Sequence, residues 1–152
     1  MSAKDGYKFE DLSVGMAHET THTITEEDVV LFAKVSGDHN PIHMDEEFAK
    51  KTPFGQRIAH GALTASYISG ILGNDLPGPG SIFTHLEMRF RRPVFIGSTV
   101  IARAEITEMI ERGNRVTLKI TCSVDDKVVV TCEFCGRDYA FTDAQIDGIY
   151  NG

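Results

Sequence analysis

The sequence predicts an α+β domain in which an antiparallel sheet wraps around one long buried helix. Residues 61–73 are apolar almost all round, as is typical of a helix enclosed by the core. Four later segments have β-strand character and almost no helical period: 82–91, 98–110, 115–124 and 127–140. Gly113-Asn114 and Asp125-Asp126 stand where two-residue hairpin turns are expected, so the second half is predicted to be an antiparallel meander.

Length and composition indicate one domain spanning 1–152 and exclude several classes of protein. The chain is 41% hydrophobic and 24% charged, which is ordinary for a globular domain. Its net charge is -7 and its one basic cluster is at 89–92, so we expect no nucleic-acid partner. No apolar stretch approaches the ~20 residues of a membrane span, and the N-terminus lacks an apolar signal core. We therefore expect a cytoplasmic protein whose three cysteines, Cys122, Cys132 and Cys135, are reduced.

The first elements are a threonine-rich strand over 17–24 and a helix that begins after Thr25. Thr25 is a good helix cap, acidic residues fill the first turn, and Asp28 stands three residues later, as in a capping box. Gly37 is suited to ending the helix. Asp45 is expected to cap a second, short helix.

The run between these helices, Ser36–Met44 (S-G-D-H-N-P-I-H-M), concentrates polar side chains that can do chemistry. Pro41 breaks helical continuation, so we expect Asp38 and His43 on a restricted loop rather than on one helical face. A carboxylate and an imidazole pointing into one cavity can hold a water molecule and move its protons. Alternatively, Asp38 shapes a turn and a backbone group satisfies His43.

A metal site is a competing interpretation of the same residues. His39 and His43, with Asp38 and His60, would supply ligands, and a His-x3-His spacing binds zinc when both rings share a helical face. Because Pro41 argues against a helix and the motif lacks its glutamate, we expect no metal. His39 is then expected to face solvent or to cap a backbone group.

The segment 57–61 leads directly into the long helix. A glycine in the first turn, Gly61, lets a ligand approach free N–H groups that favour an oxygen gaining negative charge, which describes an oxyanion hole. Gly61 equally suits close helix packing. Ser66 and Ser69 are polar residues on this apolar helix, and we expect Ser66 to bond its own backbone.

Three further features have open or structural interpretations. Arg89, Arg91 and Arg92 form an exposed strand end or receive phosphate groups of a ligand. Cys132 and Cys135 would point to opposite faces of a strand, so we expect no redox pair. A lone curved sheet leaves open edges, which favours pairing with a second copy of the chain.

Three blocks carry a resemblance to a known family: 32–43 (F-A-K-V-S-G-D-H-N-P-I-H), 58–61 (I-A-H-G) and 92–98 (R-P-V-F-I-G-S). Over roughly residues 12–140 the chain resembles the MaoC-like (R)-specific enoyl-CoA hydratases of the hot-dog superfamily. The first block is specific and the other two are supportive. The resemblance implies a hot-dog fold and a homodimer or dimer of dimers. Ser98 departs from the family, where an acidic residue is common.

The resemblance also implies a reaction and residue roles. Water would add reversibly and syn to a trans-2-enoyl-CoA, giving an (R)-3-hydroxyacyl-CoA, with no cofactor. Asp38 and His43 would activate the water, and the backbone N–H of Gly61 would bind the thioester oxygen. Ser69 would lie near this pair, and Asn40 would brace the loop.

Two other functions and the substrate range stay open. A hot-dog acyl-CoA thioesterase commonly uses an acidic residue on the central helix, and 61–73 contains none. A non-catalytic acyl-CoA-binding domain is the third possibility, because the fold does not fix the function. The sequence leaves open the acyl chain length, the pathway, and coenzyme A versus acyl carrier protein as carrier. A tunnel or plain core would each account for Ala62, Leu63, Ala65, Leu72 and Leu76.

Overall fold

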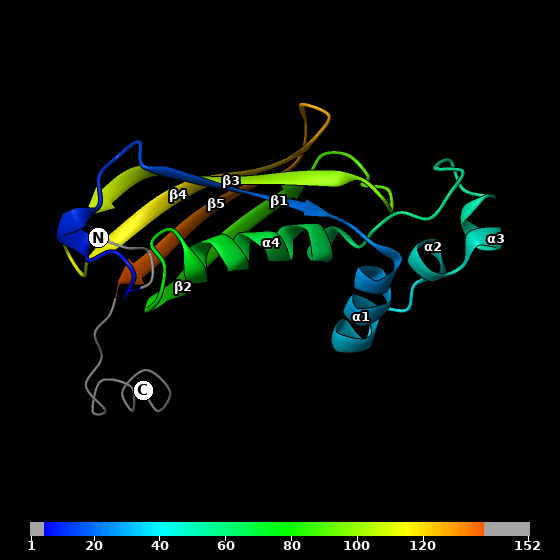
Figure 1. Ribbon diagram of the computed structural model, residues 1–152, viewed down its shortest axis with the longest axis horizontal. Helices are drawn as coiled ribbons and strands as arrows, with labels where there is room; N and C mark the ends of the chain where they lie inside the picture. The colour runs from blue at the N-terminus through cyan, green and yellow to red at the C-terminus, as the bar shows by residue number, and fades with distance from the viewer. Residues whose placement is uncertain (1–4, 139–152) are drawn as a thin grey trace.

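The computed structural model describes residues 5–138 and contains a five-stranded antiparallel sheet with one long helix along one face (Figure 1). This confirms the α+β prediction; residues 139–140 of the last expected strand lie outside the described residues. The elements are η2 (Phe9–Asp11), β1 (Ala17–Thr23), α1 (Glu26–Ser36), α2 (Pro41–Met44), α3 (Glu46–Ala49), α4 (Gly61–Asn74), β2 (Ser81–Phe90), β3 (Thr99–Ile110), β4 (Arg115–Val124) and β5 (Lys127–Asp138).

The strand order is β1-β3-β4-β5-β2, and every pair is antiparallel. Strands β3, β4 and β5 form the expected meander. The prediction of a meander over the whole second half is wrong for β2, which lies at the far edge beside β5, with Met88 opposite Cys132. Short turns join only β3 to β4 and β4 to β5, whereas the connection 91–98 is long enough to cross to the other side of the sheet.

The two hairpin turns differ from each other. Asp125 and Asp126 both have positive φ, 48° and 60°, and form the predicted two-residue turn between β4 and β5. Between β3 and β4 the two-residue prediction is wrong, because the turn takes four residues, 111–114. The Asn114 N–H donates to the Glu111 carbonyl over 3.1 Å, which closes this wider turn.

The core lies between α4 and the sheet. One face of α4 buries Leu63, Ile68, Ile71 and Leu72, the last three at 1% exposure or less. Burial alternates along β3, as expected for a strand with one face on the core. The sheet side of this core is formed by Val100, Ala102, Ala104, Ile106, Val116, Leu118, Ile120, Cys122, Val130 and Cys132.

The other face of α4 differs from the expectation of a helix buried all round. It is exposed and carries small residues, namely Gly61, Ala62, Ser66, Ser69, Gly70 and Gly73. The sheet of a single chain covers only one side of α4, which explains the difference. Part of the exposed side borders a groove of about 470 Å³ whose far wall includes the apolar β2 residues Phe83, Leu86 and Met88.

Within residues 5–138 no helix has both the length and the apolar character needed to cross a membrane. Cys122 and Cys132 are free and buried, as expected of reduced thiols, and burial raises the pKa of Cys122 to about 12 and that of Cys132 to about 11. The side chain of Cys135 lies outside the described part of the chain.

The burial of Ile71 generates a stability prediction. Ile71→Ala removes a side chain that is 0% exposed between α4 and the sheet, and we expect it to lower the free energy of unfolding by about 2–5 kcal/mol in chemical denaturation. Val35→Ala, at an α1 position that is 85% exposed, is the control and should change it by less than about 0.5 kcal/mol. If both substitutions lowered the free energy of unfolding equally at the same protein concentration, the packing of α4 against the sheet as the core would be contradicted.

Candidate active site

Helix α1 directly precedes the candidate site in the chain, and both of its ends are well defined. The Thr25 hydroxyl accepts from the Asp28 N–H (3.1 Å), and the Asp28 carboxylate accepts from the Thr25 N–H (2.8 Å), which is the expected capping box. The Thr25 N–H and the Thr25 hydroxyl, which also donates to the carboxylate (2.7 Å), lower the pKa of Asp28. At the other end Gly37 has φ 77° and donates to the Ala33 carbonyl (2.9 Å), as predicted for the helix end. Asp38 is therefore the first residue beyond the helix end.

The segment that follows is braced by its own side chains. The Asp38 N–H donates to Ser36 Oγ (3.2 Å), the Asn40 N–H donates to Asp38 Oδ1 (3.1 Å), and the Ile42 N–H donates to Asn40 Oδ1 (3.1 Å). Each side chain fixes the backbone two residues away, which is the way short polar residues hold turns. Asn40 is thus the N-cap of α2.

The prediction that His43 stands on a loop is wrong. His43 belongs to the four-residue helix α2, whose first residue is Pro41. Proline is favoured at the first position of a helix because its fixed φ is suitable there and its missing N–H has no partner to lose. Gly37 therefore ends α1, and Pro41 starts α2. Asp45 caps the following helix α3 as expected, accepting from the Phe48 N–H.

The hydrogen bond of His43 determines which ring nitrogen is free. Nδ1 lies 2.8 Å from the Ile58 carbonyl oxygen, which can only accept, so Nδ1 carries the proton in the neutral ring. Nε2 then holds a free lone pair. Burial lowers the pKa of His43, and the nearby His60 lowers it further, whereas the bond to Ile58 and the charge of Asp38 act in the opposite direction. The net lowering of its pKa favours the neutral His43 ring, whose Nε2 can accept a proton.

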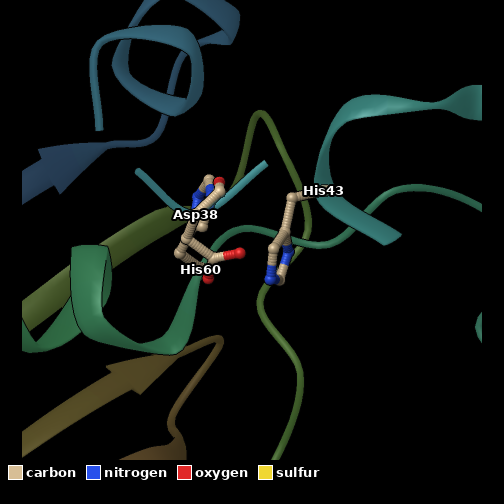
Figure 2. A group of neighbouring side chains, drawn as sticks. All are labelled: Asp38, His43 and His60. Atoms are coloured by element: carbon tan, nitrogen blue, oxygen red, sulfur yellow. The ribbon is translucent and has the colours of Figure 1, made fainter. Parts of the chain in front are cut away.

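Asp38, His43 and His60 form one cluster, in which a ligand-type atom of each lies within 4.8 Å of the others. Figure 2 shows the Asp38 carboxylate directed toward the His43 ring. The rings of His43 and His60 have centroids 4.1 Å apart, and His60 Nε2 lies 2.9 Å from the Asp38 carbonyl oxygen. His39 is exposed and is not part of this cluster.

Sequence reasoning missed one supporting residue near His43, Arg57. Its guanidinium pairs with Glu26 of α1 and Glu46 of α3, the latter with Nε 3.4 Å from the carboxylate, and these acids raise its pKa. Arg57 Nη1 also donates to the His43 carbonyl (3.3 Å). An arginine among polar residues gives no sequence signal for this role, because its partners are distant along the chain.

Gly61 begins α4 beside a cavity of about 520 Å³ that His43 also lines. The first N–H groups of a helix have no acceptor within the helix, so they are available to a ligand there. A Cβ at Gly61 would lie 2.8 Å from the Phe90 ring, so the close-packing interpretation holds as well. Arg91 and Arg92 line the same cavity, and Arg92 donates to the Val128 carbonyl (2.9 Å).

The two helix serines lie away from this cluster. Ser66 donates to the Leu63 carbonyl (2.6 Å), which confirms the expected backbone bond. Ser69 lines the groove between α4 and β2, about 12 Å along the helix axis from Gly61. The structure of one chain does not bring Ser69 together with Asp38 and His43.

Comparisons with known proteins show the family to which the chain belongs. Residues 11–128 match the family described as MaoC like domain. The chain is 49% identical over 125 residues to a 3-hydroxybutyryl-CoA dehydratase of Methylorubrum extorquens, covering 82% of this chain and 80% of that protein. It is 44% identical over 135 residues to an (R)-specific enoyl-CoA hydratase of Rhodospirillum rubrum, covering 88% and 94%.

Solved structures of R-hydratases have the same fold as this chain. An R-hydratase from Pseudomonas aeruginosa superposes with a TM-score of 0.83 at 37% identity, covering 88% of this chain and 86% of that one. An (R)-hydratase from A. caviae superposes with a TM-score of 0.82 at 36% identity, covering 84% and 98%. The chain therefore belongs to the MaoC-like family, with the hot-dog fold that its sequence predicted.

Proposed function

We propose that this protein is a hydro-lyase that adds water reversibly to a trans-2-enoyl-CoA to give an (R)-3-hydroxyacyl-CoA. One observation carries the proposal: the Asp38 carboxylate lies within 4.8 Å of the His43 imidazole, and His43 lines a cavity that the first residue of α4, Gly61, also lines. The names of the relatives, a 3-hydroxybutyryl-CoA dehydratase and an (R)-specific enoyl-CoA hydratase, support the same reaction.

The geometry supports a simple sequence of proton transfers. Asp38 and His43 hold one water molecule, and His43 Nε2 accepts a proton from it as its oxygen bonds to C3 of the enoyl group. Negative charge moves to the thioester oxygen, where the Gly61 N–H stabilises it. The pair then returns one proton to C2 from the same face, which makes the addition syn. No cofactor is needed, because the thioester itself acidifies C2.

Two further residues have proposed supporting roles. Asn40 braces the segment that carries the pair, through its bond to the Ile42 N–H. Ser69 is distant from the pair in one chain, so its proposed role near the pair depends on a neighbouring copy. Helix α4 contains no carboxylate, and this argues against the thioesterase alternative.

The first prediction concerns the catalytic pair. Asp38→Asn and His43→Ala each remove a group that handles the water, and we expect each to lower kcat for crotonyl-CoA hydration by at least about 100-fold. The assay follows the loss of the conjugated enoyl absorbance. His39→Ala is the matched control, since His39 belongs to the same run but is exposed and outside the cluster. Activity that survives both substitutions would refute the assignment.

The pH dependence provides a second prediction. His43 must be neutral to accept a proton, and its pKa lies below the ordinary value of 6.5. As the pH falls, kcat/KM should therefore drop with a midpoint below 6.5. The pH dependence of kcat/KM is the one to measure, because it reports the groups of the free enzyme. An acid limb centred at or above 6.5, measured with crotonyl-CoA under subsaturating conditions, would show that the base is another group.

We further propose that the chain forms a homodimer, or a dimer of dimers, through β2. This strand lies at the edge of the sheet, and its side chains Ile82, Phe83, Leu86, Met88 and Phe90 are 37–55% exposed. An exposed apolar edge strand is a site for pairing with another chain. The small residues on the open face of α4 would let a second copy approach closely.

Light scattering after gel filtration tests this assembly. We expect a mass of two or four times the 16.8 kDa chain, and we expect Leu86→Arg to yield single chains because it places a charge in the proposed interface. Val30→Arg, at a comparably exposed apolar position on α1, should leave the mass unchanged. A wild-type protein with the mass of one chain would exclude the dimer.

The cytoplasm is the location we propose, because the buried free thiols Cys122 and Cys132 are typical of a reducing compartment.

A further inference from the structure

His60 is a buried histidine with no part in the proton transfers described above. It precedes Gly61 as the N-cap residue of α4, but its side chain makes no capping bond. Its exposure is 1%, and polar residues are that deeply buried only with a structural or functional reason.

The hydrogen bond of the His60 ring shows which ring nitrogen is the donor. Nε2 lies 2.9 Å from the Asp38 carbonyl oxygen, which only accepts, so Nε2 carries the proton and donates it. Nδ1 is buried and has no partner among the described residues. The bond from Nε2 is therefore the one hydrogen bond that the His60 ring makes to the described residues.

The ring also contacts two other aromatic rings near the catalytic pair. Its centroid lies 4.9 Å from that of Phe32 of α1, with the planes at 52°. It lies 4.1 Å from that of His43 of α2, with the planes at 33°. His60 therefore contacts the two helices that flank Asp38 and is covalently joined to Gly61.

We propose that His60 is a positioning residue that holds Asp38 and His43 at a fixed position relative to the Gly61 N–H. The hydrogen bond to the Asp38 carbonyl is the essential contact, because Asp38 is exposed and its bonds to Ser36 and Asn40 stay within its own segment, whereas His60 ties it to α4. This inference rests on the proposed hydratase function. A shift of the pair by about 1 Å would slow the reaction by on the order of 100-fold without weakening substrate binding.

Two substitutions separate the hydrogen bond from the packing of the ring. In His60→Gln the amide nitrogen takes the place of Nε2 and still donates to the Asp38 carbonyl, although the ring is lost. In His60→Phe the ring is kept and the donor is lost. We expect the Gln variant to retain kcat within about 5-fold of wild type. For the Phe variant we expect kcat to fall on the order of 100-fold with KM within about 2-fold.

His18→Phe is the matched control. His18 is a half-buried histidine beside Asp75, at the opposite end of α4 from His60, with 3.6 Å between Nε2 and the carboxylate. The His18→Phe variant should have the kcat and KM of wild type. Thermal unfolding of each variant checks that the chain is folded, and His60→Leu replaces His60→Phe if the latter does not fold, because it also lacks a donor.

The outcomes are distinct. Equal losses of kcat in the Gln and Phe variants, a loss confined to KM, or full activity of the Phe variant would each overturn the role of the hydrogen bond. Loss of wild-type activity after EDTA treatment that Zn²⁺ restores would make His60 a metal ligand and would also overturn it. A wild-type enzyme that fails to hydrate crotonyl-CoA or any longer enoyl-CoA would instead refute the proposed function.

Discussion

The packing of α4 on the sheet is the interaction on which the rest of the structure depends. Ile68, Ile71 and Leu72 are buried against the strands, so one helix supplies most of the side of the core opposite the sheet. Its axis and its ends are fixed by that burial. The N–H of Gly61 therefore lies at a place set by the core, beside Phe90 of β2, and not at a place set by a flexible loop.

Polar contacts attach the other half of the site. Helices α1, α2 and α3 lie beyond the end of the sheet that the start of α4 faces (Figure 1). His43 is tied to the Ile58 carbonyl, His60 to the Asp38 carbonyl, and Arg57 to Glu26, Glu46 and the His43 carbonyl. Hydrogen bonds are directional, so they define the orientation of a group that remains accessible to substrate more closely than apolar packing would.

Local signals in the sequence were sufficient for the elements and for part of the site. The Thr25 cap, the Gly37 end and the extent of α4 follow from neighbouring residues, and so does the grouping of Asp38 with His43. The edge position of β2 and the exposed face of α4 depend on which strands pair at long range, which no local pattern specifies. His60 and Arg57 went unrecognised as supports because their polar partners are 11–31 residues away.

Strand β2 links the site to the proposed assembly. Its last residue, Phe90, lines the cavity that contains His43 and Gly61, and its earlier residues Phe83, Leu86 and Met88 line the groove along α4. An edge strand has a neighbouring strand on one side only, so it is held less firmly than an interior strand. Pairing of β2 with a second copy would give it a neighbour on its other side and fix Phe90 over Gly61. The shape of the substrate cavity would then depend on association as well as on the fold of the single chain.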